Sequence, residues 1–381
     1  MSGDPEQEFF ADGLVEDIIT TLSKLAGLTV IARNSTFVYK GRAVDLREVG
    51  KELGVRYLLE GSVRRAGAKI RVAAQLIDAH TGSHVWAERY DRPLDDIFAV
   101  QDEITLVLAT EMQVKLTEGE QARLRYTSTG NVEAWTLWVQ GLSFARQAVT
   151  KENWTRALAL WQRALALDPD SSPLNAMVGL IHVGDARFGW WDDRPTALAK
   201  GRHATKALSV DPENADAQIT AGYADMIEGQ WDNAIAHIRK AVETAPLSAD
   251  AATLASFILA CAGQPLESTP LIERAIQLSP HYPANYLGHL GNAYRLTGRF
   301  EEAIAAFVAY DARSAGFGLT DLVIAYQQTN RPDLAHQTAE RFLVLGPAFT
   351  VAGWLRTQFR RDRALLDAEA AALTAAGLPP E

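Results

Sequence analysis

The chain lacks the features that mark several large classes of protein. Cys261 is the single cysteine among 381 residues, which excludes an internal disulfide. The longest apolar runs are much shorter than the roughly 18 residues that a membrane helix requires. Acidic residues outnumber basic ones by 47 to 37, so the basic face that general nucleic-acid or anionic-membrane binding requires is missing. We therefore expect no nucleic-acid partner and no membrane span in this chain.

Motifs of catalysis and metal binding are equally scarce. The chain has no glycine-rich phosphate loop, no Gly-x-Ser-x-Gly elbow and no His-Glu-x-x-His helix. His80 and His84 lie four residues apart, but across an expected hairpin turn, where helical metal geometry does not apply. We predict no catalytic residue, no metal site and no cofactor. Cys261 is expected inside a helix as a small buried residue, the alternative being a reactive thiol.

A pattern that returns at close to 34 residues fills the chain from about residue 138 to residue 349. A typical copy has a small residue, then an aromatic residue or isoleucine, then alanine, then proline. The clearest copies are Ala157, Trp161, Ala164 and Pro169, then Ala234, Ile238, Ala241 and Pro246, then Ser268, Ile272, Ala275 and Pro280; Lys200, Ala204, Ala207 and Pro212 form a looser copy. Such a period is typical of stacked helix pairs. Small residues three and four apart share one helix face and let a neighbouring helix approach closely.

Other positions make the repeat type more specific. Glycine recurs at Gly179, Gly222 and Gly291, and tyrosine recurs at Tyr294 and Tyr326. With turns such as 297–303, these residues resemble the tetratricopeptide repeat. The resemblance implies a superhelix of six repeats over residues 132–349, followed by capping helices over 350–381. The second unit is about nine residues too long, around residues 189–193, between its two helices.

The first third of the chain has a different pattern. Apolar spacing and glycine stops predict helices, and β-branched runs joined by turns predict strands. The expected helices are Phe10–Leu25, Asp45–Gly54 and Asp95–Val114, and the expected strands are Leu28–Ala32, Tyr57–Val63, Ile70–Ile77 and Ser83–Arg89. The fold class is an α+β amino-terminal domain over residues 1–116, with a three-stranded meander on helices. A linker, 117–131, joins it to the all-α repeat superhelix.

Blocks in this first part resemble a known module. They are residues 2–14, 30–35, 39–41, 60–64 and 75–78. The module stands beside tetratricopeptide repeats in many proteobacterial class III adenylate cyclases, and it is similar to the amino-terminal domain of TolB. In that family an apolar strand usually precedes the position of Ser2. The resemblance implies a carboxy-terminal piece of a longer protein, or a gene whose start was assigned late.

Phe10-Ala11-Asp12-Gly13 looks like the strand that holds catalytic metal in class III cyclases. Two-metal chemistry needs a second carboxylate on an adjacent strand, together with nucleotide-reading residues, and none of that context follows. Gly13 begins a helical pattern instead. We expect Asp12 to lie at a helix start or on the surface.

These patterns favour a non-catalytic regulatory or adaptor protein that binds a protein or peptide partner, self-association included. The first helix of each pair lines the concave side of such an array. By repeat register, this groove displays Arg146, Leu180, Tyr223, Phe257, Asn292, Arg295 and Ile324. Its expected guest is an extended or helical apolar segment.

Two further candidate contacts lie outside the groove. Trp190 and Trp191 stand in the insertion of the second repeat, where exposed aromatic residues indicate a contact surface and packing is the alternative. Arg33, Asn34 and Ser35 follow an expected strand, where polar residues often line a site, with a plain solvated loop as the alternative.

A second function stays open beside the adaptor. It is the regulatory half of a class III adenylate or guanylate cyclase, with the catalytic domain upstream or in a neighbouring gene. As written, the sequence predicts a cytoplasmic protein; an upstream membrane helix would make the periplasm the alternative.

Overall fold

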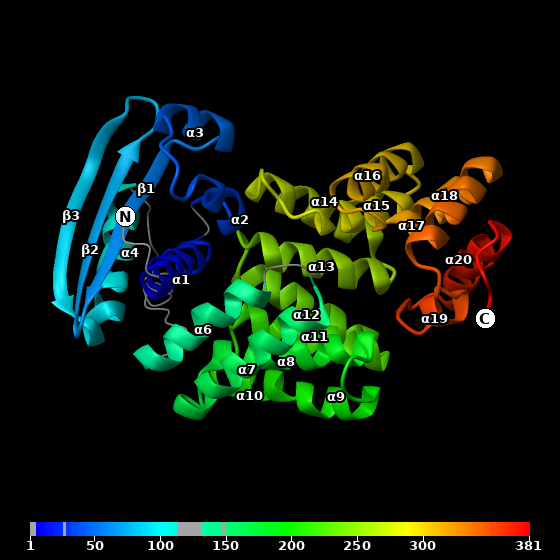
Figure 1. The fold of residues 1–381 in the computed structure, drawn as a ribbon, viewed down its shortest axis with the longest axis horizontal. Helices are drawn as coiled ribbons and strands as arrows, with labels where there is room; N and C mark the ends of the chain where they lie inside the picture. Colours follow the sequence, from blue (N-terminus) through cyan, green and yellow to red (C-terminus); the bar gives the residue numbers. More distant parts are fainter. Residues whose placement is uncertain (1–4, 26–27, 113–130, 146–148) are drawn as a thin grey trace.

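The computed structural model describes residues 5–25, 28–112, 131–145 and 149–381, in two parts that follow each other along the chain. A sheet with helices forms the first part, and a long curved array of helices forms the second (Figure 1). Residues 117–130 of the expected linker lie outside the described residues. The predicted fold class, an α+β domain followed by an all-α repeat array, is confirmed.

The amino-terminal module is an antiparallel meander with strand order β1-β2-β3. Along β2, the side chains of Ile70, Val72, Ala74 and Leu76 are buried, while those between them are more exposed. One face of the sheet therefore packs on helices α1 and α4 and the other meets solvent. The bounds are β1 Tyr57–Ala66, β2 Lys69–Asp78, β3 Ser83–Pro93, α1 Pro5–Leu22 and α4 Ile97–Glu111.

Short elements complete the module, and one expected strand is wrong. The helix predicted at Asp45–Gly54 is confirmed, because the Asp45 carboxylate accepts from the backbone N–H of Arg47 and Gly54 closes the helix at φ 66°. The strand expected at Leu28–Ala32 joins no sheet in its described residues, 28–32. A strand needs a hydrogen-bonded neighbour, and here the Ala32 N–H bonds to Leu278 in the repeats. The short elements are α2 Arg33–Thr36, η1 Phe37–Tyr39, α3 Leu46–Leu53 and η2 Leu94–Asp96.

The second part is a succession of antiparallel helix pairs. The second helix of the second pair is broken into α9 and α10, and a loop at residues 189–193 precedes it, where the sequence shows its excess length. The bounds are α6 Val132–Ala145, α7 Lys151–Leu167, α8 Ser172–Phe188, α9 Arg194–Gly201, α10 His203–Val210, α11 Ala215–Glu228, α12 Trp231–Thr244, α13 Ala249–Cys261, α14 Pro265–Leu278, α15 Asn285–Leu296, α16 Phe300–Arg313, α17 Leu319–Gln328, α18 Pro332–Leu345, α19 Val351–Leu355 and α20 Arg363–Ala375.

The recurring small residues of the sequence lie where helices touch. Ala157, Ala164, Ala234 and Ala241 are fully buried, as close helix packing requires. At Gly291 an added Cβ would lie 2.4 Å from the ring of Phe307, so any other residue here would have to displace that ring. The first helices α8, α11, α13 and α15 each stack on the next one. We call these four helices, together with α17 at the end of the array, the inner wall.

None of the helices in the described ranges combines the length and the apolar composition needed to cross a lipid bilayer.

Candidate functional site

The amino-terminal module is joined to the first repeat through α1 and α6. The indole N–H of Trp135 donates to the Asp17 carboxylate over 2.7 Å, and the ring of Phe10 meets that of Trp135 edge-on at 4.9 Å. At Gly13 an added Cβ would lie 2.3 Å from Val139, so the two helices approach only because this residue has no side chain. Phe10 and Gly13 of the cyclase-like motif thus have packing roles.

Asp12, the acidic residue of that motif, lies within helix α1 and not on a strand. Its carboxylate pairs with Lys40 at 2.6 Å and with Arg33 at 3.4 Å. Both partners belong to the segment that follows the expected strand. The carboxylate therefore holds the α2 region onto α1. Asp12 lies in the middle of that helix and is partly exposed, so the helix start expected from the sequence is wrong.

A second contact joins the module to the end of α14. Besides the bond from Ala32 to Leu278, the buried Ser35 hydroxyl accepts from the backbone N–H of His281 over 2.8 Å and lies 3.2 Å from the Ser279 hydroxyl. The His281 ring lies 3.2 Å from the Tyr39 hydroxyl and 3.3 Å from a Glu52 oxygen. Ser35, one of the three candidate contact residues, thus contacts the chain's own repeats.

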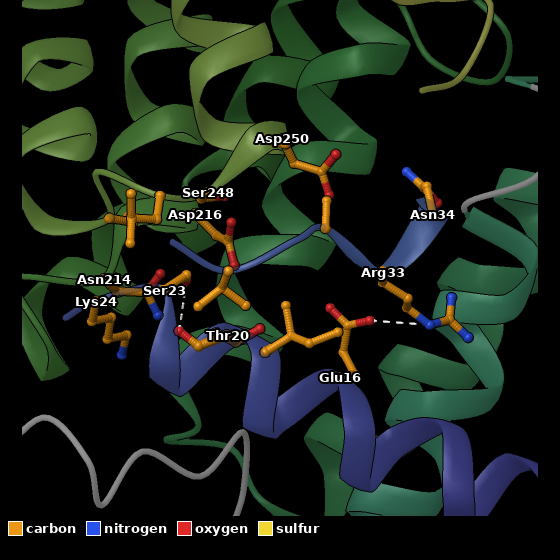
Figure 2. Close-up of a pocket in the computed structure, with 17 residues that line it drawn as sticks. Glu16, Thr20, Ser23, Lys24, Arg33, Asn34, Asn214, Asp216, Ser248 and Asp250 are labelled. Carbon is orange, nitrogen blue, oxygen red and sulfur yellow. Dashed lines mark hydrogen bonds and ion pairs between the residues drawn. The ribbon is translucent and has the colours of Figure 1, made fainter. Parts of the chain in front are cut away.

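A cleft of about 110 Å³ lies between these two contacts. Figure 2 shows Glu16 and Thr20 on α1 facing the start of the repeat helices, with Arg33 and Asn34 on the segment above. The cleft-lining ends of α11 and α13 carry Asn214, Asp216, Ser248 and Asp250.

The polar groups of this cleft are already engaged. Asn214 and Ser248 cap their helices by accepting from the backbone N–H groups of Ala217 and Ala251. Asp250 accepts from the Tyr286 hydroxyl over 3.0 Å. Such a space suits a few water molecules better than a substrate. Within the described ranges, no group of three or more His, Cys, Asp or Glu residues is placed to hold a metal ion.

The inner wall carries the residues that repeat register assigned to the groove. Tyr223 on α11 and Phe257 on α13 stand side by side, with ring centroids 6.2 Å apart and nearly perpendicular planes. The Arg187 guanidinium lies 4.9 Å from the Phe257 centroid, and the His289 ring lies 5.4 Å away on the next helix. Burial, followed by the charge of Arg187, lowers the pKa of His289 to about 4. This side chain is therefore neutral at pH 7.

The other groove candidates are distributed along the same helices. Leu180 is half-buried and packs against the apolar cluster that contains Tyr223. Asn292 is half-buried, whereas Arg295 and Ile324 are buried beneath the chain's own last helix. Arg146 lies outside the described residues.

The segment that buries Arg295 and Ile324 runs from Arg356 to Ala375, and we call it the carboxy-terminal cover. Its first part crosses the inner wall: the Arg361 N–H donates to the Cys261 carbonyl over 2.9 Å. Phe359 packs on the cluster around Phe257. Cys261 is buried, and burial raises the pKa of its thiol, which matches the small buried residue expected from sequence.

A buried charge cluster lies beneath the cover. Glu369 on α20 pairs with Arg295 on α15 and, at 3.5 Å, with Arg360. The Arg360 guanidinium also reaches Asn292 and the Cys261 sulfur, each at 3.5 Å. The sequence interpretation missed Arg360 and Glu369. The available signal was an acidic residue on the apolar face of an expected helix, which indicates a buried ion pair.

The tryptophan loop of the second repeat is packed more closely than an open contact loop. The Asp185 carboxylate accepts from the backbone N–H groups of Trp190, Trp191 and Asp192, at 2.7 to 3.0 Å. The Trp190 ring stacks on Phe188 with centroids 4.7 Å apart. Both tryptophans are half-buried. Packing therefore accounts for part of this surface, and whether it also binds a partner stays a prediction.

An apolar cavity of about 490 Å³ lies inside the amino-terminal module. Helices α1, α3 and α4 and strands β1 and β2 line it. Consecutive residues of β1, 57–63, face it, so the cavity follows the outer edge of that strand. In the described part of the chain, no backbone hydrogen bond fills this edge.

Fold and contacts together define a class: an α+β module fixed onto a superhelix of tetratricopeptide type. The described order is a three-stranded sheet, then helix pairs α6–α7 to α17–α18, then a helical cap. Two comparisons with known sequences show which proteins the chain resembles.

Residues 4–106 match the family model of the HilA/YgeH-like transcriptional regulator, second domain. The chain is also 46% identical over 228 residues to a protein named "Putative adenylate cyclase 3" from Rhizobium meliloti (strain 1021). The match covers 59% of this chain and 38% of that protein, so the chain spans well under half of the relative's length. Over part of its length the chain thus resembles a protein with an adenylate cyclase name, as the sequence motifs predicted.

Solved structures with similar helical arrays are more distant. PilF of Pseudomonas aeruginosa aligns with a TM-score of 0.41 and 14% identity, over 59% of this chain and 95% of that one. YrrB, described as a tetratricopeptide-repeat protein with an unusual peptide-binding site, aligns with a TM-score of 0.35 and 18% identity, over 49% and 93%. Both TM-scores are below 0.5.

Proposed function

We propose that this chain is a non-catalytic regulatory adaptor that binds a segment of another protein on the inner wall of its repeats. The observation that carries the proposal is the wall itself. Tyr223, Phe257 and Arg187 come from three successive first helices and form one contiguous aromatic and cationic cluster, in which Arg187 and Phe257 are partly exposed and Tyr223 is buried. Aromatic and arginine side chains clustered at the centre of a surface supply most of the binding energy in protein interfaces.

The test compares wild-type protein with the Tyr223→Ala, Phe257→Ala double variant in pull-downs from the native host. We expect capture of a partner to weaken by on the order of 2 kcal/mol or more, as for central aromatic anchors. Phe317→Ala is the matched control, because this side chain is 58% exposed and contacts Tyr310 of α16, and neither Tyr223 nor Phe257 is among its ring contacts.

Thermal melts of all three proteins accompany the pull-down, since Tyr223 is itself buried and its loss costs some stability. A folded double variant that captures the partner as well as wild type would move the binding site off the inner wall. The loop with Trp190 and Trp191 would then be the next surface to test.

The second candidate function is the regulatory part of a nucleotide cyclase. The observation that favours it is the 46% identity to a protein with an adenylate cyclase name. The purified chain should make no cyclic nucleotide from ATP or GTP with magnesium or manganese. When fused to a cyclase catalytic domain, it should change that domain's rate, and the double variant should abolish the change. Both functions would be contradicted if this chain alone made cyclic nucleotide and the Asp12→Asn variant did not.

A further inference from the structure

Helix α20 is seated on the inner wall as an amphipathic ligand would be. Its buried residues, Leu366, Glu369 and Leu373, lie three and four residues apart and so share one face. Leu373 packs in the same cluster as Ile324 of α17, and Glu369 reaches Arg295 of α15. Figure 1 shows α20 beside α17 at the carboxy-terminal end of the array. Anchors with this spacing are the way an amphipathic helix binds in a groove.

The charges under α20 are unevenly matched. The Glu369 and Arg295 side chains are each 1% exposed, and Glu369 is shared between Arg295 and Arg360. Burial raises the pKa of Asp321, the nearby second carboxyl, which favours its neutral form. The Nε and Nη1 atoms of Arg295 are buried and have no hydrogen-bond partner among the described residues. Buried donors without partners oppose the contact between α20 and the wall.

We propose that the stretch of the inner wall formed by α15 and α17 is a receptor for an amphipathic helix with the pattern aliphatic–carboxylate–aliphatic, and that α20 occupies it in cis. A helix of the same pattern from a partner protein displaces α20. This inference rests on the proposed function, because it names the partner for the same wall. It also gives the cover a role: a partner must compete with a tethered helix, whose effective concentration is on the order of millimolar.

Charge and shape of the wall select this class of helix. When α20 leaves, Arg295 and Ile324 are the groups that it uncovers. A carboxylate satisfies the arginine as Glu369 does, and an aliphatic side chain covers the isoleucine. A basic helix would place like charges together at Arg295, and a wholly apolar helix would leave that guanidinium buried without the carboxylate that Glu369 supplies.

The experiment uses the full chain and a fluorescent peptide with the sequence of residues 362–378. Binding is followed by anisotropy to wild-type protein and to Leu366→Ala, which weakens the cis helix and leaves the receptor intact. We expect the variant to bind the peptide at least tenfold more tightly than wild type. A peptide carrying Glu369→Gln should bind the variant at least tenfold more weakly. Equal binding by both proteins, or equal binding of both peptides, would overturn the inference.

A second variant covers the case in which Leu366→Ala does not fold. Asp362 caps α20 by accepting from the Leu365 N–H over 3.2 Å, and both residues lie outside the charge cluster. Asp362→Ala should loosen α20 alone and strengthen peptide binding about fivefold. The pull-down distinguishes the helix inference from the proposed adaptor function. A partner that the inner wall captures, and that this peptide fails to displace, would overturn the helix inference and leave the adaptor function standing.

Discussion

The repeats meet two other parts of the chain, and the two contacts differ in chemistry. At the amino-terminal joint, where α1 and the α2 segment meet the repeats, Asp17 accepts a hydrogen bond from the Trp135 indole N–H. Ser35 accepts one from the His281 backbone N–H, and aromatic rings pack beside the first of these contacts. Under the carboxy-terminal cover, the Glu369 carboxylate pairs with the guanidinium groups of both Arg295 and Arg360. Two buried N–H groups of Arg295 have no hydrogen-bond partner within the described structure. Satisfied buried networks rigidify a structure, whereas partly satisfied ones are costly to keep closed. We therefore expect a fixed joint and an exchangeable cover.

The largest effect should come from forcing the joint open. In Gly13→Leu the new side chain must enter space held by Val139 and Trp135, 2.3 and 2.6 Å from its Cβ. Overpacking of this severity should lower the free energy of unfolding by about 3 kcal/mol, measured by chemical denaturation. Glu8→Leu, at an exposed position of the same helix, is the control and should cost less than about 0.5 kcal/mol. Equal losses in the two variants would remove the evidence for a tight joint.

Acid should destabilise the wall beneath the cover. The pKa of His289 in the folded protein is about 4, below its ordinary value of 6.5. The unfolded chain therefore binds this proton more tightly, and stability is complete above pH 6.5 and falls as the pH drops towards 4. We expect a loss on the order of 2 kcal/mol over that range, allowing for partial exposure of the ring. His289→Gln should flatten the profile, and an unchanged profile would contradict the assignment.

A smaller effect separates the two contacts directly. If the cover opens readily, Glu369→Gln can lower the free energy of unfolding by no more than the free energy needed to open the cover. We therefore expect a loss of about 1 kcal/mol. In a fixed cover, breaking this buried pair would cost about 3 to 5 kcal/mol. Asp17→Asn is the matched change at the joint and should cost about 2 kcal/mol, because it weakens a charged hydrogen bond that cannot open alone. A larger loss for Glu369→Gln than for Asp17→Asn would reverse the comparison.

The sequence predicts local features of this fold better than distant contacts. Alanine spacing and proline stops are local signals, so the helix pairs could be found from the residues alone. The expected strand at Leu28–Ala32 was wrong because a strand depends on a neighbour, which no local pattern reports. The pair Arg295–Glu369 joins residues 74 apart, and Ser35–Ser279 joins residues 244 apart. Such pairings arise from the curvature of the array.

The candidate site was predicted in part. Repeat register placed Tyr223 and Phe257 on consecutive first helices, and their rings do stand together on the inner wall. The register could not show that the chain's own last helix covers Arg295 and Ile324, because that depends on how the array ends. Whether these residues bind a partner stays a prediction.

Hydrogen exchange of the native protein tests the central claim most directly, because it measures the opening of the joint and the cover in one sample without substitution. Backbone amides of α20 should exchange at least tenfold faster than those of α1 and α6. Their exchange rate should not change with low concentrations of denaturant, because the opening is local. Amides of α1 and α6 should exchange only with larger unfolding. If α20 is protected as strongly as α1, and through the same opening, the cover is a fixed cap and the account is contradicted.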